Sequence, residues 1–237
     1  MSGNRPMFRS LPRAGAVVAA VTYGVVIRPR LLTWGATRTE AAGGWPGDEL
    51  IPQYDGQSTM ATTLPAPPDA VWPWLVQMGC NRAGWYSFDR LDNAGRPSAE
   101  HIVTQWQDLK EGQHLEAVPD GGAWFTAALI EPERDLVLRM TLELPSGHPF
   151  EARFGPLSGA YTDAVWGFHL RRTEQGGTRL VVRTRGRSRP RPLTRPLDLM
   201  LWEPVHLVMQ LRQFRNLRTR VSTDRQTLTV ATTATAP

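Results

Sequence analysis

Three polar side chains in the first half of the chain have a spacing that could support chemistry. Tyr86, Asp89 and Asn93 follow one another at i, i+3 and i+7, which places them on one side of a helix if residues 86–93 are helical. A phenol, a carboxylate and an amide on one stripe could orient a ligand carbonyl or enol, or relay a proton. The structural alternative is that Asp89 pairs with an arginine while Tyr86 anchors the helix.

Other kinds of reactive site are not indicated. The sequence has no metal-ligand spacing, phosphate-binding loop, dinucleotide fingerprint or nucleophile elbow, so we expect no metal and no cofactor. Cys80 is the only cysteine, which excludes an intramolecular disulfide and a cysteine-based metal site. We interpret it as a buried structural thiol and expect a reducing, cytoplasmic location.

The charge of the chain does not indicate nucleic-acid binding. The formal net charge is +5, but Lys110 is the only lysine, and many arginines alternate with apolar residues. We interpret these arginines as the solvated outer face of a sheet. Because the sequence has no helix-turn-helix pattern and no basic motif with interspersed aromatic residues, we expect no nucleic-acid partner.

The elements that position the candidate residues include several strands with alternating apolar residues. In one of them Trp166, Phe168 and Leu170 alternate with Gly167, His169 and Arg171, which predicts Trp166 and Phe168 inside and His169 outside. The pattern is typical of a half-buried antiparallel sheet. The predicted strands are residues 58–64, 114–118, 124–130, 136–142, 165–172 and 179–185.

Helices precede and follow this run of strands. After a proline-rich start, Val71, Trp74, Leu75 and Met78 recur at helical spacing. A long final helix is predicted over about residues 198–221, with Leu207 and Leu211 in its apolar stripe. A strand, two helices, a run of strands and a final helix predict an α+β domain. The last helix would cover the apolar face of the sheet.

The two ends of the chain are predicted to be extensions of this domain. An apolar run at residues 14–27 follows Arg5, Arg9 and Arg13. As a helix it would rise about 21 Å, short of the roughly 30 Å hydrocarbon core of a bilayer. A docking or membrane-surface helix and a true membrane anchor both remain open. The expected division is an extension at 1–54, a domain at 55–222 and a disordered tail at 223–237.

Several motifs occur in order between about residues 34 and 222. They are Trp34–Thr37, Pro46–Leu50, Ala66–Gly79, Gly84–Asp89, Trp106–Lys110, Glu203-Pro204 and Val208-Met209. With these motifs the chain resembles a bacterial branch of the START-like, or SRPBCC, superfamily, which includes polyketide cyclases/dehydratases and lipid-transfer proteins. That branch has a histidine where this chain has Pro97, and an arginine where it has His101. Chemistry that depends on that histidine is therefore not carried over.

The resemblance implies a helix-grip fold, in which a curved antiparallel sheet wraps around the long C-terminal helix and encloses a cavity. Superfamily members hold lipids, polyketides and other apolar molecules there. The first hypothesis is a carrier or sensor of a polyketide-, lipid- or terpenoid-like molecule. The alternative is a cyclase or dehydratase that uses acid and base groups in the cavity. A weaker alternative is a membrane-associated interaction protein that attaches through residues 14–27.

Each hypothesis assigns residues to the site. An enzyme would use Tyr86 and Asp89, with Glu203 as a further acid. Glu203 and Gln210 border the apolar stripe of the last helix, where a desolvated carboxyl could stay neutral; a solvated edge position is the alternative. His206 is expected to be exposed. The expected ligand contacts are Tyr86, Asp89, Asn93, Trp106, Trp166, Phe168, Leu207 and Leu211.

Overall fold

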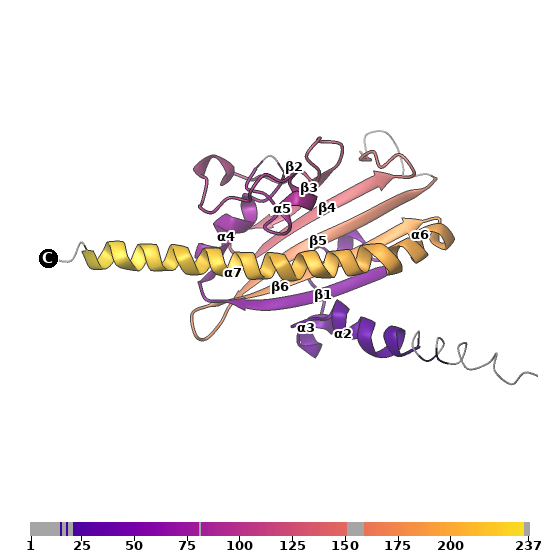
Figure 1. Ribbon diagram of the computed structural model, residues 1–237, viewed down its shortest axis with the longest axis horizontal. Coiled ribbons are helices and arrows are strands. Elements are labelled where there is room, and N and C mark those ends of the chain that lie inside the picture. Colours follow the sequence, from indigo (N-terminus) through magenta and orange to yellow (C-terminus); the bar gives the residue numbers. More distant parts are fainter. Residues whose placement is uncertain (1–14, 16–17, 19–20, 81, 151–158, 235–237) are drawn as a thin grey trace, which may run out of the picture.

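A six-stranded antiparallel sheet organises the computed structural model, which describes residues 15, 18, 21–80, 82–150 and 159–234 (Figure 1). The strand order is β1-β6-β5-β4-β3-β2, so β1 and β2 are the edges. Every predicted strand is present. The strands are β1 (Gly56–Leu64), β2 (His114–Glu116), β3 (Trp124–Glu131), β4 (Asp135–Glu143), β5 (Tyr161–Arg172) and β6 (Thr178–Arg189).

The two faces of the sheet follow from the alternation of side chains. In β5, Phe168 belongs to the main apolar core, whereas Val165 belongs to a second cluster on the opposite face. Phe168 pairs in register with Leu136 of β4 and Val182 of β6, which are core residues too. The inner face is therefore the one that carries Phe168, and His169 lies on the outer face, as predicted.

The C-terminal helical segment is longer than the sequence pattern predicted. It begins with α6 (Arg191–Leu197), continues through the π-helical turn η5 (Asp198–Trp202) and ends with α7 (Glu203–Ala234). No glycine or proline follows Pro204 before Ala234, so the sequence contains no strong breaker after Val221. Residues 223–234, expected to be a tail, continue the helix.

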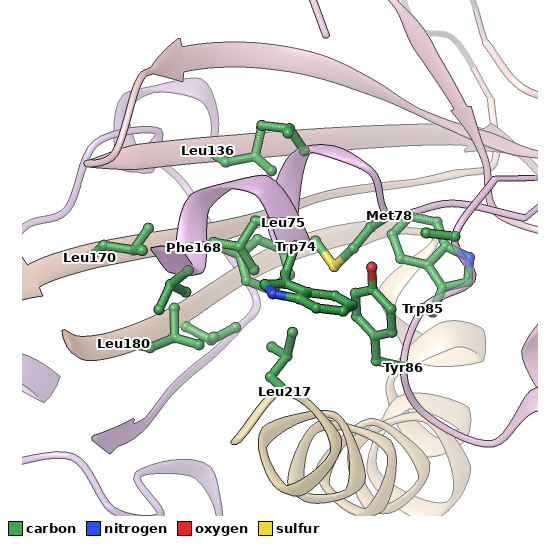
Figure 2. Close-up of a cluster of buried hydrophobic side chains, with 14 of the residues drawn as sticks. Trp74, Leu75, Met78, Trp85, Tyr86, Leu136, Phe168, Leu170, Leu180 and Leu217 are labelled. Carbon is green, nitrogen blue, oxygen red and sulfur yellow. The ribbon is translucent and has the colours of Figure 1, made fainter. Parts of the chain in front are cut away.

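Helix α7 runs along the inner face of the sheet, which gives the predicted helix-grip α+β fold (Figure 1). The main core lies between this face, α4 (Pro68–Val76) and the middle of α7. It is filled by large side chains with almost no exposed surface (Figure 2). They include Trp74, Leu75, Met78, Tyr86, Leu136, Phe168, Leu170, Leu180 and Leu217. Cys80 is buried here as well, as predicted for a structural thiol.

The outer face of the sheet is covered, contrary to the prediction of a solvated arginine surface. Residues of the N-terminal extension, including α3 (Arg38–Ala42) and the 3-10 turn η2 (Asp48–Leu50), lie over it. Ile51 packs with Val137 and Val165. Arg183 is only 3% exposed and binds Asp48 at 3.1 Å. Arg179, Arg183 and Arg185 of β6 are therefore ion-pair partners of Glu40 and Asp48 in this cover.

The segment that precedes this cover is helical. It comprises the π-helical stretch η1 (Tyr23–Ile27) and α2 (Arg28–Leu32). Trp34 then accepts a hydrogen bond at its carbonyl from Ala61 of edge strand β1. Gly35 has φ +71°, and an added Cβ would lie 2.1 Å from the Ala61 carbonyl oxygen, so this close approach requires glycine. Within the described part of the chain, no helix has the length and apolarity needed to cross a membrane.

Candidate functional site

The inner face of the sheet differs in burial between its two ends. Phe168 and Leu138 have no exposed surface, whereas Trp166 and Met140, farther toward the other end, are half-buried. On α7, Leu207 and Leu211 are half-buried beside them and pack against the main core. We call these four half-buried residues the open end of the grip.

Aromatic rings continue from the packed core into the open end. Trp166 lies 4.7 Å from Phe168, 5.5 Å from Trp85 and 5.6 Å from Phe125, measured between ring centroids. Trp85 and Phe125 meet edge to face at 5.4 Å. Such rings provide a rigid apolar wall with a polarisable surface, which suits an apolar or aromatic ligand.

A chain of hydrogen bonds through two glutamines of α7 joins the side chain of Trp166 to the backbone of Trp85. Trp166 donates from Nε1 to Oε1 of Gln210 at 3.2 Å, and Gln210 donates from Nε2 to Oε1 of Gln213 at 2.8 Å. Gln213 donates onward to the Trp85 carbonyl at 2.9 Å. Both glutamines are buried. Gln210, expected at the edge of the apolar stripe, therefore faces the sheet, and its hydrogen-bonding groups are held in place.

His206 lies one helical turn before Gln210 and is half-buried, whereas it was expected to be exposed. Its ring meets Trp166 edge to face at 6.3 Å, and its Nε2 is buried without a hydrogen-bond partner among the described residues. Burial lowers the pKa of this imidazole to about 4, so it is neutral at pH 7. The spacing of the sequence could have indicated this position, because residues 206, 210, 213 and 217 share one side of α7 and Leu217 belongs to the core.

Tyr86 lies in the packed core and is not part of a helix. The predicted helix over 86–93 is reduced to α5 (Asp89–Asp92), and Tyr86 precedes it with a φ of 58°. The phenol oxygen accepts a hydrogen bond from Nε2 of Gln77 at 2.8 Å, and the ring packs on Trp74 (Figure 2). Burial raises the pKa of Tyr86 above its ordinary value.

Asp89 and Asn93 hold the loop that follows Tyr86. Ser98 donates from Oγ to Oδ1 of Asp89 at 2.5 Å and accepts from the Tyr86 amide at 3.2 Å. Asn93 donates to the Arg96 carbonyl at 2.8 Å. The partner of Asp89 is thus a serine, not the arginine expected in the structural alternative. Tyr86 and Asp89 are joined through Ser98, but no common helix face presents them with Asn93.

Glu203, the first residue of α7, forms an ion pair with Arg28. Arg28 donates from both Nε and Nη2 to its two carboxylate oxygens, at 2.6 Å each, and Arg195 lies 3.6 Å away. The carboxylate is largely buried, with 15% of its side chain exposed. A bidentate guanidinium therefore holds both carboxylate oxygens, which differs both from the desolvated acid of the enzyme hypothesis and from a solvated edge position.

The remaining predicted ligand contacts are apolar. Phe168 is fully buried, while Trp106, Trp166, Leu207 and Leu211 are partly buried and pack against the same core. Trp106 belongs to the 3-10 turn η3 (Thr104–Trp106), and its carbonyl accepts a hydrogen bond from Arg82. Of the predicted residues, Trp166, Leu207 and Leu211 belong to the open end.

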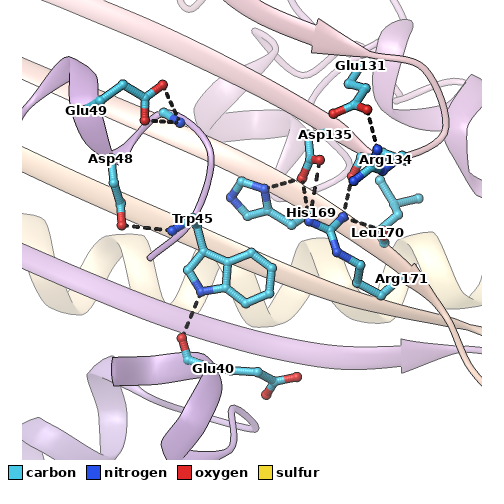
Figure 3. A network of polar contacts seen from close by, with 11 residues as sticks. Glu40, Trp45, Asp48, Glu49, Glu131, Arg134, Asp135, His169, Leu170 and Arg171 are labelled. Carbon is cyan, nitrogen blue, oxygen red and sulfur yellow. Dashed lines mark hydrogen bonds and ion pairs between the residues drawn. The ribbon is translucent and has the colours of Figure 1, made fainter. Parts of the chain in front are cut away.

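A fully buried histidine, His169, lies on the outer face of the sheet. Nδ1 of His169 is 2.7 Å from Oδ1 of Asp135, and the Trp45 ring stacks over the imidazole at 4.8 Å (Figure 3). Arg171 approaches the same carboxylate at 3.2 Å. Burial lowers the pKa of His169 despite its acidic partner. This cluster is closed by the N-terminal cover, and we interpret it as structural.

Two further features define what surrounds the site. The described residues contain no group of three histidine, cysteine or acidic side chains that could hold a metal ion.

A surface hollow of about 550 Å³ lies between the β2–β3 and β4–β5 connections, lined in part by Val118, Trp124 and His148. None of the residues of the open end lines this hollow, so we do not assign the ligand to it.

Comparison with known proteins gives matches among solved structures. No family model matches the chain, and neither does any curated protein sequence. Among solved structures, protein MLL2253 from Mesorhizobium loti is 14% identical with a TM-score of 0.41, over 70% of this chain and 97% of that one. DynU16, from the dynemicin biosynthetic locus, is 16% identical with a TM-score of 0.40, over 70% of this chain and 48% of its own. Ara h 8.0201 is 14% identical with a TM-score of 0.36, over 68% of this chain and 97% of its own. The matches concern overall shape alone.

Proposed function

We propose that the protein binds an apolar small molecule of polyketide, lipid or terpenoid type at the open end of the grip, as a carrier or sensor. The observation that carries this proposal is the buried Nε2 of His206, which lies beside the Trp166 ring and has no hydrogen-bond partner in the described part of the chain. Half-buried Trp166, Leu207 and Leu211 supply the apolar surroundings. Apolar walls with a few convergent polar groups are typical of small-molecule sites.

The unpartnered nitrogen matters because burial makes it costly. A buried polar atom without a hydrogen bond destabilises a fold by about 1–3 kcal/mol, and native structures contain few of them. A ligand hydroxyl or carbonyl near Nε2 would provide the missing bond, since a neutral imidazole nitrogen either donates or accepts. The ligand would then be an apolar molecule with at least one oxygen substituent.

The same imidazole supports a second candidate, a cyclase- or dehydratase-like enzyme. A neutral histidine in an apolar site can accept a proton from an enolisable ligand. The previously expected acid and base groups support it less, because Tyr86, Asp89 and Glu203 all have protein partners. An enzyme in this site would therefore depend on His206.

Native mass spectrometry of the purified full chain, followed by denaturing extraction, tests the binding proposal. We expect a co-purifying apolar molecule, or a thermal shift with members of a panel of fatty acids and aromatic polyketides. Trp166→Leu and His206→Phe should weaken binding by roughly tenfold, because a lost buried hydrogen bond or ring contact costs on the order of 1.4 kcal/mol. Leu91→Ala, on exposed α5, is the matched control. An apo mass with no thermal shift across the panel would contradict the proposal.

A further inference from the structure

Two segments far apart in the sequence expose large apolar side chains at the same end of the molecule. Met200 is 81% exposed, Leu193 75%, Val25 70% and Trp202 61%. Isolated exposed apolar residues are ordinary, but a group of this size is not. We call this group the apolar face: Val18, Val21, Tyr23, Val25, Val26 and Ile27 of the N-terminal segment, with Leu193, Leu197, Met200, Leu201, Trp202, Val205 and Val208 of α6, η5 and α7.

An ion pair joins the two segments of the apolar face. Arg28, directly after Ile27, makes its bidentate ion pair with Glu203, directly after Trp202. Arg195 of α6 lies 3.6 Å from the same carboxylate. Figure 1 shows the N-terminal helical segment and α6 at the same end of the sheet. The ion pair thus fixes two exposed apolar helical segments beside each other.

Exposed arginine side chains lie beside the apolar face, where most of the acidic side chains are ion-paired. Residues 15–32 contain no acidic residue, and Arg30 is exposed. Arg191 pairs with Asp55 at 3.1 Å but keeps 59% of its side chain exposed. The neighbouring acidic side chains Asp55 and Glu203 are largely buried and ion-paired. Asp198 of η5 is half-buried and accepts a hydrogen bond from Ser188 at 3.3 Å. Exposed arginine beside exposed apolar surface therefore gives this end of the molecule a cationic and apolar character.

We propose that the apolar face docks on the surface of an anionic lipid bilayer. The apolar side chains would enter the boundary between headgroups and acyl chains, and Arg30 and Arg191 would pair with lipid phosphates. Tyr23 and Trp202 suit this depth, because their rings are apolar with one polar atom. A helix exposed on every side between Val21 and Ile27 also fits a surrounding layer of lipid. This proposal is independent of the ligand at the open end.

Sedimentation of the full chain with lipid vesicles tests the proposal. We expect binding to vesicles of phosphatidylcholine with phosphatidylglycerol, and weaker binding to phosphatidylcholine alone or at high salt. Leu197→Glu with Met200→Glu should reduce the partition coefficient at least tenfold. Arg30→Gln with Arg191→Gln should reduce it by about fivefold per arginine on anionic vesicles only. Leu91→Glu, which changes an apolar residue 73% exposed on α5, should bind as the wild type does.

Two results would overturn the proposal. One is a wild-type chain that stays in the supernatant with anionic vesicles. The other is sedimentation that the paired glutamate substitutions leave unchanged while their circular dichroism matches the wild type. Light scattering distinguishes the competing occupant: a dimer that these substitutions dissociate, without vesicle binding, would make the face a contact between copies of the chain.

Discussion

The indole of Trp166, on the inner face of β5, donates a hydrogen bond of 3.2 Å to the side chain of Gln210 on α7. The bond joins the sheet to its covering helix at the border between the packed core and the open end. Gln210 has almost no exposed surface, so water does not replace this contact easily. The geometry of the candidate site therefore depends on one buried amide.

Gln210→Leu tests that dependence. The substitution leaves Nε1 of Trp166 and Oε1 of Gln213 without their partners, and an unsatisfied buried group costs about 1–3 kcal/mol. We expect the free energy of unfolding to fall by about 2 kcal/mol in urea titrations. Gln105→Leu, at an exposed position, is the matched control and should change stability by less than about 0.5 kcal/mol. Equal effects of the two substitutions would show that the Trp166–Gln210 bond contributes no stability.

His206 should make stability depend on pH. Its pKa is lowered from 6.5 to about 4 by burial, so the folded chain binds fewer protons than the unfolded chain between these values. Stability is therefore greatest above about pH 6.5 and falls as the pH decreases toward 4, by roughly 3 kcal/mol for this group. His206→Phe should remove this dependence. Unfolding titrations of both proteins between pH 4.5 and 7.5 measure the difference.

The comparison isolates His206 from other titrating groups. His169 is also buried with a lowered pKa, but it is present in both proteins, so its contribution cancels. His101→Gln, at an exposed position, is the control for replacing a histidine. A parallel profile for wild type and His206→Phe would mean that this imidazole titrates normally in the folded chain.

The ion pair between Arg183 and Asp48 should contribute more than an exposed pair. Arg183 is 3% exposed, and Asp48→Asn leaves its guanidinium, and that of Arg185, with less compensation. Removal of one partner of a buried pair costs about 3–5 kcal/mol, although Thr59 and two backbone carbonyls still accept from Arg183. We expect a loss of about 3 kcal/mol in chemical unfolding. Asp69→Asn, which breaks an exposed pair with Arg172, should cost less than about 1 kcal/mol.

The strands could be predicted from the sequence because a strand places every second side chain on the same face. Phe168 and His169 were assigned to the correct faces on that basis. The cover over the outer face could not be predicted. Arginine at alternate positions has the same pattern whether it meets water or, as Arg183 does, a buried carboxylate from a distant segment. Only tertiary structure distinguishes these two environments.

The candidate site was less predictable than the fold. Tyr86 precedes a single helical turn and has a left-handed backbone conformation, which the spacing of Tyr86, Asp89 and Asn93 does not reveal. His206 and Gln210 lie beside the apolar stripe of α7, and their direction depends on how the helix is rotated against the sheet. Packing sets that rotation, so polar residues at the edge of a stripe remain ambiguous in sequence.

Gly167 should be required by the side chain two residues further along β5. An added Cβ at this position would lie 2.6 Å from Nε2 of His169 and 3.0 Å from Cε1. The ring cannot move aside easily, because Asp135 binds its Nδ1 at 2.7 Å and Trp45 stacks over it (Figure 3). We therefore expect Gly167→Ala to lower the melting temperature and to cost about 1–3 kcal/mol, the usual cost of overpacking.

A double-mutant cycle distinguishes this collision from a general intolerance of alanine in the strand. With His169→Ala already present, the space is open, and Gly167→Ala should cost less than in the wild type, with a coupling energy of about 1 kcal/mol or more. Gly186→Ala on β6 is the matched control, since its nearest neighbour would lie at an ordinary 3.7 Å. An equal cost of Gly167→Ala in both backgrounds would mean that the imidazole is not what excludes a side chain at residue 167.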